Sequence, residues 1–300
     1  MIDRSVPCPS CRSGACRFVG KIPAGSSALN ELPSQPAALY SCDSCSLQFK
    51  HPRPSAEELS RIYAAAQPAW AYDPQTRLDW ERALAFMEER LPGGSVLDVG
   101  CYDGAFLCYA GSGFKRYGIE PNTAAAARAR EQGIELAGSD LSAVSVCVDC
   151  VTAFDVIEHV PDPLAFLESA AARMKPGGFL IIATGNAEAP SFRFMRGGYW
   201  YCQLPEHLSF ISPAWAQRAA EKLGLKVIRT EAYSHLGRPK FHTRMFEALA
   251  NVAYRLSPSL LRLCRLLLKA FRGGDYQTVD HAPSWASSRD HVLIIFEKPR

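Results

Sequence analysis

From residue 95 onward, short apolar segments alternate with longer segments in which apolar residues recur every three or four positions. The short segments predict strands at residues 95–99, 116–120, 134–137, 147–154, 179–184, 226–232 and 291–297. The longer ones predict helices at residues 104–112, 123–131, 163–174 and 213–223. This alternation is typical of an α/β domain with a mostly parallel sheet, seven-stranded here, and helices on both faces. We expect a ligand over the carboxyl ends of the strands.

Helical patterns also flank this body. One begins at the acidic turn after Ser55 and continues through Leu59, Ile62 and Tyr63, and another spans residues 80–91 and ends at Pro92-Gly93-Gly94. We therefore divide the chain into an N-terminal module at residues 1–54, a helical linker or cap at 55–94, a core domain at 95–237, an inserted helical hairpin at 238–288 and a last core strand at 289–300.

The predicted hairpin carries one apolar and one basic feature. Its first helix has an apolar face formed by Met245, Leu249, Val252 and Leu256, and Ser257-Pro258 ends that helix. The second helix has apolar residues from Leu260 to Phe271 and a basic stripe of Arg262, Arg265, Lys269 and Arg272. Three interpretations stay open: a cap with a solvated basic face, peripheral contact with an anionic membrane or a lipid-linked phosphate, and a dimer interface.

Composition excludes several classes of protein. The chain is 48% hydrophobic and 21% charged, as in globular proteins, and its net charge of +3 is too small to indicate nucleic-acid binding. No apolar run reaches the roughly 18 residues needed to span a bilayer, and the first residues do not resemble a signal peptide. We expect a cytoplasmic protein whose 11 cysteines are reduced.

Four of these cysteines form two CxxC pairs, Cys8 with Cys11 and Cys42 with Cys45. Four thiolates at this spacing can surround zinc tetrahedrally, and the metal then supplies folding energy to a short segment. We predict structural zinc at these four residues, with Cys16 as a substitute ligand. Unliganded thiols are the main alternative, and a redox role lacks the strand–helix context that it requires. The proline- and serine-rich stretch between the pairs predicts a loop or hairpin.

The most informative segment, residues 98–104 (DVGCYDG), lies between a predicted strand and a predicted helix. Such a glycine turn lets a ligand approach bare backbone at a helix N-terminus, where amide groups have no partner within the helix. Glu120 follows at the end of the next strand. A carboxylate at about this spacing, roughly 20 residues beyond the glycines, suits the two hydroxyls of a ribose.

The segment from about residue 95 to residue 224, together with the last strand, resembles the class I S-adenosylmethionine-dependent methyltransferases, which have a Rossmann-like fold. The resemblance depends on the glycine turn, on EHVPDP at residues 158–163 and on KPGG at residues 175–178. It implies S-adenosylmethionine as cofactor and places Glu120 on the ribose and Asp140 beside the adenine. The implied cofactor-binding residues are Asp98, Gly100, Tyr102, Gly104, Glu120, Asp140, Phe154 and Asp155.

Two segments resemble members of this family that carry an N-terminal zinc-binding segment, among them sugar methyltransferases. They are the cysteine pairs with the LQF strand that follows, and the sequence PEHLSFISP at residues 205–213. Tyr102 stands where most of the family has a second glycine. The carbon-methylating sugar enzymes have Tyr-His-Glu-His where this chain has Leu204-Pro205-Glu206-His207, so carbon methylation does not follow.

Methyl transfer requires a nucleophile lined up behind the methyl group and, for an oxygen acceptor, a base. His207 is our first candidate for that base and His159 the second; a loop histidine bonded to backbone is the alternative for each. We expect Glu158 and Asp155 to orient groups rather than to take protons. Tyr199, Trp200 and Tyr201 form either a substrate wall or ordinary packing.

We therefore predict a methyltransferase that acts on a small molecule, expected to be a sugar or glycan precursor methylated on oxygen, with a lipid-linked acceptor as a further option. A non-catalytic cofactor-binding protein with a recruiting zinc module is the second hypothesis. Methylation of RNA or protein is a third hypothesis, and the chain lacks the extended basic, aromatic-interleaved pattern that nucleic-acid binding would favour.

Overall fold

The computed structural model describes residues 6–23, 36–55, 57–59, 61, 77–235, 237–257, 259 and 282–300. In these residues a seven-stranded sheet has the strand order β10-β11-β8-β7-β4-β5-β6. Neighbouring strands from β8 to β6 run parallel, and β11 is antiparallel to both β8 and β10. The strands are β4 (Ser95–Val99), β5 (Lys115–Ile119), β6 (Glu135–Gly138), β7 (Val148–Phe154), β8 (Met174–Gly185), β10 (Lys226–Tyr233) and β11 (His291–Glu297).

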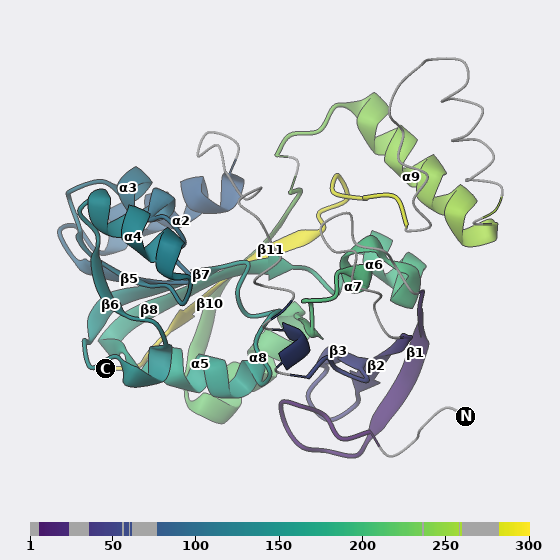
Figure 1. Cartoon of the computed structure of the whole chain (residues 1–300), viewed down its shortest axis with the longest axis horizontal. Helices are drawn as coiled ribbons and strands as arrows, with labels where there is room; N and C mark the ends of the chain where they lie inside the picture. Colours follow the sequence, from purple (N-terminus) through teal and green to yellow (C-terminus); the bar gives the residue numbers. More distant parts are fainter. Residues whose placement is uncertain are drawn as a thin grey trace.

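Helices cover both faces of this sheet, which confirms the predicted architecture (Figure 1). One face carries α2 (Leu78–Arg90), α3 (Ala105–Ala110) and α4 (Thr123–Glu131), whose apolar residues form a buried cluster with β4 and β8. The opposite face carries α5 (Pro163–Ala172) and α8 (Pro213–Leu223), and its cluster contains the fully buried Trp215. Two buried apolar layers therefore fix the sheet between the helices.

Local sequence explains where these helices begin. Asn122 accepts hydrogen bonds from the amides of Ala124 and Ala125, and Asp162 and Ser212 cap α5 and α8 in the same way. Proline occupies the first position of α5 and of α8, where its missing N–H costs nothing. These caps lie at the same end of the sheet as the expected ligand, so they also fix the loops that border the site.

The observed boundaries differ from the predicted ones mainly at glycines. The helix predicted at residues 104–112 is α3, which is shorter because Gly104 and Gly111 have φ angles of +82° and +78° at its two ends. The strand predicted at residues 179–184 begins at Met174, because the preceding residues stay extended beside the chain end. There the amide of Lys298 donates to the carbonyl of Gly178.

A second sheet has the strand order β1-β2-β3-β9. Its strands are β1 (Cys16–Ile22), β2 (Ala37–Cys42), β3 (Gln48–His51) and β9 (Ser209–Phe210). The pairing of β1 with β2 confirms a hairpin between the cysteine pairs, and residues 24–35 lie outside the described part. β9 comes from the core domain, so the N-terminal module is joined to the core by strand pairing. The predicted division into domains stays a prediction.

Several further helices lie near this junction. They are α6 (Pro190–Met195), the short 3-10 helix η3 (Arg196–Gly198), α7 (Trp200–Gln203) and α9 (Phe241–Leu256), and a further 3-10 helix, η2 (Leu141–Ala143), follows β6. Three residues of the apolar face predicted for α9, Met245, Leu249 and Leu256, are exposed, whereas Asn251 and Tyr254 are buried.

Two predicted features lie outside the described residues. They are the second helix of the hairpin with its basic stripe (Arg262, Arg265, Lys269 and Arg272), and the Ile62–Tyr63 part of the helix predicted after Ser55. None of the described helices combines the length and apolarity needed to cross a membrane.

Candidate functional site

The turn after β4 requires glycine at two positions. Gly100 has φ +74°, and a Cβ atom there would lie 2.7 Å from Cγ2 of Val156. Gly104 has φ +82°, and its Cβ would lie 2.8 Å from Cγ1 of Ile134. Because L side chains are strained at these φ angles and would also clash, both positions keep bare backbone at the start of α3. This is the environment that a closely approaching ligand needs.

Tyr102 occupies the middle of this turn with φ +48°. That conformation explains why glycine is the usual residue at this position, since a side chain in the left-handed region is strained. The guanidinium carbon of Arg128 lies 5.2 Å from the centre of the Tyr102 ring, so the ring is held against α4. The turn therefore keeps its conformation although tyrosine replaces the usual glycine at position 102.

Glu120 connects the turn to the end of β5. Its Oε2 accepts a hydrogen bond from the amide of Tyr102 (2.9 Å), and its Oε1 accepts one from the amide of Asn122 (2.7 Å). Burial raises the pKa of Glu120 and outweighs the effect of these two bonds. Each oxygen keeps a further acceptor position. The carboxylate is thus oriented beside the glycine turn, as binding of a vicinal diol requires.

The other predicted cofactor residues have different surroundings. Asp98 is buried and accepts a hydrogen bond from the hydroxyl of Thr152 (2.6 Å), and burial raises its pKa to about 7. Asp140 is exposed and caps η2 through the amide of Ser142. Phe154 packs against Phe106, with ring centroids 4.5 Å apart. The structure therefore places Asp98 beneath the turn, Asp140 at the rim beyond β6 and Phe154 in an aromatic cluster.

Asp155 lies in an ionic network that the sequence analysis missed. Its φ is +55°, its Oδ2 accepts from Arg77 (2.9 Å), and its Oδ1 lies 3.8 Å from Nε2 of His291. Burial alone would raise the pKa of Asp155, but Arg77 and the neighbouring histidines His291 and His235 lower it below its usual value. No local pattern could have shown this network, because Arg77 precedes α2 and His291 begins the last strand.

His291 is itself buried and paired. Its Nδ1 lies 2.9 Å from Oδ2 of Asp290, and this partner raises its pKa despite the opposing effect of burial. His235 lies beside it, with ring centroids 4.5 Å apart. The sequence Asp290-His291 at the start of a predicted strand was the only available indication of this pair.

The two predicted bases lie together next to Glu158. Ring centroids of His159 and His207 are 4.8 Å apart, and one side-chain atom of each of Glu158, His159 and His207 lies within 4.8 Å of the others. Glu158 is buried and accepts hydrogen bonds from the hydroxyls of Thr184 (2.8 Å) and Tyr201 (2.5 Å). The EHVPDP loop and the PEHLSF loop, distant in sequence, therefore form one polar cluster.

His207 is buried, and its protonation state follows from its surroundings. Burial, together with His159 and the cation of Lys50, lowers its pKa well below the usual value, so the ring is neutral near pH 7. Its Nδ1 lies 3.1 Å from the carbonyl oxygen of Tyr201 and donates to it in the neutral ring, which leaves Nε2 as the acceptor. A neutral imidazole with a fixed tautomer is the form that a general base requires.

The four cysteines of the two CxxC pairs come together. The sulfur atoms of Cys8 and Cys45 are 3.6 Å apart, those of Cys11 and Cys42 are 3.5 Å apart, and all four lie within 4.8 Å of one another. Four thiolates bound tetrahedrally to one zinc ion at about 2.3 Å would be separated by about 3.8 Å, so the cluster has the size of a zinc site. Cys16 is not part of this cluster.

The N-terminal module contacts both loops of the histidine cluster. Lys50 donates from Nζ to the carbonyl of Leu204 (2.7 Å), and Arg53 donates to the hydroxyl of Ser209 (2.8 Å) and to the carbonyl of Pro161. Lys50 is buried and Arg53 is partly buried, and burial lowers the pKa of Lys50 to about 8. The module therefore supports the candidate site, a role that the sequence pattern did not indicate.

The strand order, the glycine turn and the carboxylate at the end of β5 define a class I S-adenosylmethionine-dependent methyltransferase. Residues 72–230 match a methyltransferase domain family, and the chain belongs to that family. The protein is therefore an enzyme, in agreement with the first sequence hypothesis.

Curated relatives support this conclusion. A ubiquinone biosynthesis O-methyltransferase from Aeromonas salmonicida is 33% identical over 196 residues, covering 57% of this chain and 81% of the relative. A protein of the same description from Bordetella avium is 33% identical over 200 residues, covering 56% and 80%. A solved structure from Bacillus halodurans, assigned as a methyltransferase, has a TM-score of 0.51 and 15% identity over 73% of this chain and 98% of its own, which shows the fold alone.

Proposed function

We propose that this protein transfers the methyl group of S-adenosylmethionine to a hydroxyl oxygen of a small molecule. The observation that carries the proposal is the joined geometry of the turn at residues 100–104 and Glu120, which lies on the same edge of the sheet as a histidine pair whose His207 is buried and neutral. The relatives described as O-methyltransferases support oxygen as the acceptor atom.

The bare backbone at Gly100 and Gly104 would hold the cofactor, and Glu120 would accept hydrogen bonds from its ribose hydroxyls. Asp98, Tyr102, Asp140, Phe154 and Asp155 are the other residues proposed to border it. When bound, the cofactor supplies an electrophilic methyl group. The residues of the protein would orient the acceptor, exclude water and take the proton from the acceptor hydroxyl.

His207 is proposed to take that proton at Nε2, because its Nδ1 is engaged with the carbonyl of Tyr201. His159, which is only partly buried and contacts the His207 ring, is the second candidate. Glu158 would hold Tyr201, whose carbonyl engages Nδ1 of His207, rather than take the proton itself.

Two acceptor classes compete. The relatives are ubiquinone biosynthesis O-methyltransferases, which favours a hydroxylated quinone precursor as the acceptor. A sugar or glycan precursor is supported only by the resemblance of two short segments, the cysteine pairs with their strand, which lie outside the matched family region, and residues 205–213, which lie within it. We place the quinone precursor first. Incubating the enzyme with S-adenosylmethionine and each class separately, and measuring S-adenosylhomocysteine, distinguishes them.

The four clustered cysteines are proposed to bind one structural zinc ion, since their sulfur spacing suits tetrahedral coordination. The ion would fix the turns that carry Ser10 and Ser44 against α8. There Trp215 donates to the hydroxyl of Ser10 (3.3 Å), and Arg218 donates to the carbonyl of Ser44 (2.7 Å).

Replacing His207 by Ala should lower the turnover number by about 100-fold, the usual contribution of a general base, while cofactor affinity stays unchanged. His242→Ala is the matched control, because His242 is exposed on α9. Both are assayed against the wild type. Full activity of the His207 variant, or equal loss in both variants, would contradict the role of base.

A further inference from the structure

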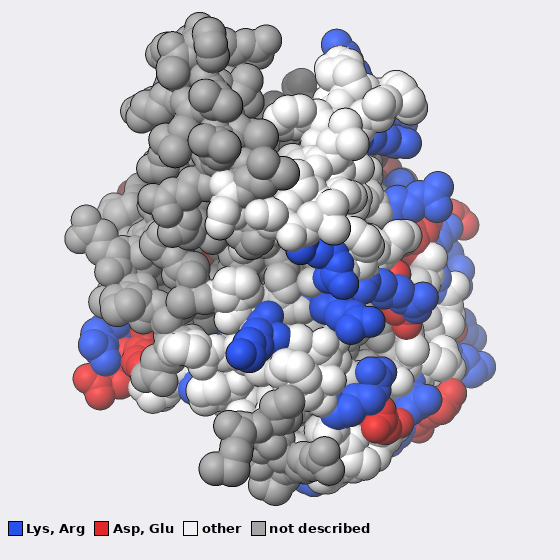
Figure 2. Space-filling model, turned by 90° about the vertical axis from the view of Figure 1, so that its right-hand side faces the viewer, with Lys and Arg blue, Asp and Glu red and all other residues white. Residues whose placement is uncertain are grey.

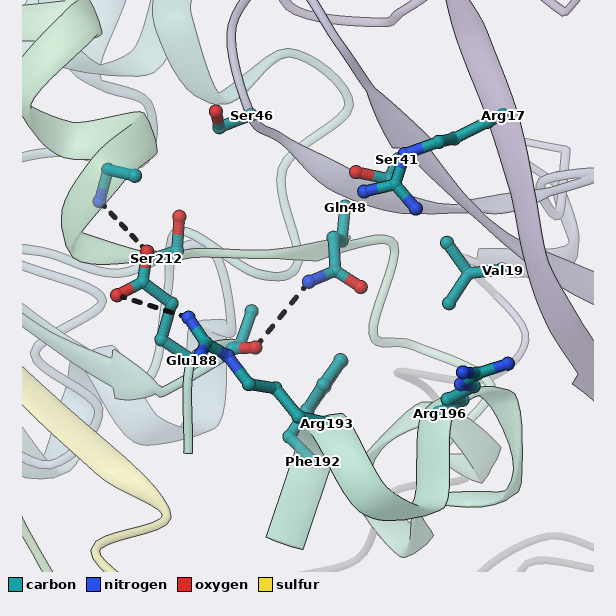
Figure 3. A pocket seen from close by; sticks show the side chains of 12 residues that line it. Arg17, Val19, Ser41, Ser46, Gln48, Glu188, Phe192, Arg193, Arg196 and Ser212 are labelled. Atoms are coloured by element: carbon teal, nitrogen blue, oxygen red, sulfur yellow. Dashed lines mark hydrogen bonds and ion pairs between the residues drawn. The ribbon is translucent and has the colours of Figure 1, made fainter. Parts of the chain in front are cut away.

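A hollow of about 330 Å³ lies at the seam between the N-terminal module and the core, apart from the glycine turn (Figure 3). Strands β1, β2 and β3 line one side, and the β8–α6 loop, α6, η3 and the start of α8 line the other. Its volume is within the range of small-molecule sites, roughly 300–1,000 Å³. Neither the sequence analysis nor the proposed methyl transfer uses it.

The lining of this hollow is strongly basic. Arg17 comes from β1, Arg193 from α6 and Arg196 from η3, and Glu188 is the one carboxylate among the lining residues. Figure 3 shows the three arginines around the same space, and Figure 2 shows basic side chains gathered on this side of the molecule. Three guanidinium groups facing one concavity repel one another, so an anion placed between them is favoured.

The existing ion pairs leave most of the positive charge of the three arginines available to bind an anion. Arg17 uses Nε on Asp43 (3.0 Å), and its two Nη groups have no carboxylate partner within the described residues. Arg193 approaches Glu188 only to 4.0 Å, and the structure shows no carboxylate paired with Arg196 among the described residues. Both ion pairs are exposed, so solvent weakens them. Guanidinium groups bind phosphate through two parallel N–H donors, which Lys cannot do.

The backbone holds these arginines in place. A Cβ atom on Gly197 would lie 2.4 Å from the carbonyl oxygen of Lys21, so η3 and β1 touch without side chains between them. Arg196 has φ +53°, which L residues rarely adopt. Positive φ angles also occur at Tyr102 and Asp155 in the proposed cofactor site, at Ser46 in the lining of the hollow, and at Arg12 and Arg289 elsewhere. Such conformations are concentrated at ligand sites, where surrounding structure maintains them.

Neutral groups complete the lining. The hydroxyls of Ser41, Ser46 and Ser212 supply donors, and Val19 and Phe192 form an apolar wall. We propose that this hollow binds the phosphate or pyrophosphate group of a phosphorylated compound, with Arg17, Arg193 and Arg196 as its ligands. The apolar wall accommodates the part of the compound attached to the phosphate. This site is independent of the proposed methyl transfer.

Isothermal titration of the full chain with inorganic pyrophosphate tests this proposal. The wild type should bind pyrophosphate, and Arg196→Gly should weaken that binding by about tenfold or more, because one bidentate contact is lost. Glycine is chosen because it tolerates the φ of Arg196, so the guanidinium is removed without backbone strain. Arg17→Ala should have an effect of similar size.

Arg130→Ala is the matched control, since Arg130 is an exposed residue of α4 and its loss changes the net charge equally. S-adenosylmethionine binding by every variant verifies the fold and should not change. The proposal fails if the wild type does not bind pyrophosphate at millimolar concentrations, or if all variants including Arg130→Ala weaken binding alike.

The same titration, extended to lipid, distinguishes the source of the phosphate. Sedimentation with phosphatidylcholine vesicles containing phosphatidic acid presents a phosphate at a membrane surface. Vesicle binding that pyrophosphate displaces, and that Arg196→Gly removes, would assign the hollow to a lipid headgroup. Pyrophosphate binding without vesicle binding would assign it to a free phosphorylated compound.

Discussion

A single substitution at Glu120 tests whether this carboxylate binds the ribose of S-adenosylmethionine. Its carboxylate holds the amides of Tyr102 and Asn122 and would also bind the ribose. Hydrogen bonds to a charged group contribute about 1.5–3 kcal/mol, so Glu120→Ala should raise the Kd for S-adenosylmethionine by about 10- to 100-fold. Calorimetric titration measures this, with Glu131→Ala on the exposed end of α4 as the control. An unchanged Kd for Glu120→Ala would refute the assignment.

Asp98 should make stability depend on pH. Burial raises its pKa to about 7, whereas an unfolded aspartate has a pKa of about 3.9. Between these values the folded protein binds more protons than the unfolded chain, so this contribution to stability is present at low pH and is lost as pH rises toward 7. Its upper limit is about 4 kcal/mol.

Asp98→Asn removes this dependence, because the amide oxygen can still accept from Thr152. Urea unfolding from about pH 5 to about pH 8 should show the wild type losing free energy of unfolding relative to Asp98→Asn as pH rises. A constant difference between the two proteins across that range would show that Asp98 titrates normally.

The cysteine cluster acts on whole structural elements, because it holds together the N-terminal module that supports two loops of the site. Arg53 and Lys50 contact the loops at residues 158–162 and 204–209, so loosening the module should loosen both. Cys42→Ala should abolish the binding of one zinc ion per chain and lower amide-exchange protection of these loops by about tenfold or more.

Cys147→Ala is the control for this measurement, since Cys147 is exposed and lies outside the cluster. Metal analysis and hydrogen exchange on both variants separate the two effects. Protection of β4 and β5 should stay unchanged. Equal protection of the loops in Cys42→Ala and wild type would show that the module does not support the site.

Elements were largely predictable because their patterns are local. The strands at residues 95–99 and 291–297 and the helices at residues 123–131 and 213–223 have the predicted bounds, since caps and glycines mark their ends. The early start of β8 was not predictable, because its first residues pair with the chain end. The burial of α9 was not predictable either: polar Asn251 is buried while Met245 and Leu249, on the predicted apolar face, are exposed.

At the scale of the whole molecule, the site is assembled from distant segments. The glycine turn and Glu120 could be predicted because they follow consecutive strands at a characteristic spacing. The network of Arg77, Asp155 and His291 could not, since its members come from a helix start, a mid-chain loop and the last strand. The contact of His159 with His207 accompanies backbone hydrogen bonds from Leu208 and Ser209 to the carbonyl of Glu158, which no sequence periodicity shows.

The most direct test of the central claim is a crystal structure of the protein with S-adenosylhomocysteine. The account predicts the ligand over the turn at residues 100–104, with both ribose hydroxyls hydrogen-bonded to Glu120 and the sulfur atom directed toward the histidine cluster. An empty crevice at saturating ligand, or ligand bound at another place with Glu120 still facing only the amides of Tyr102 and Asn122, would contradict it.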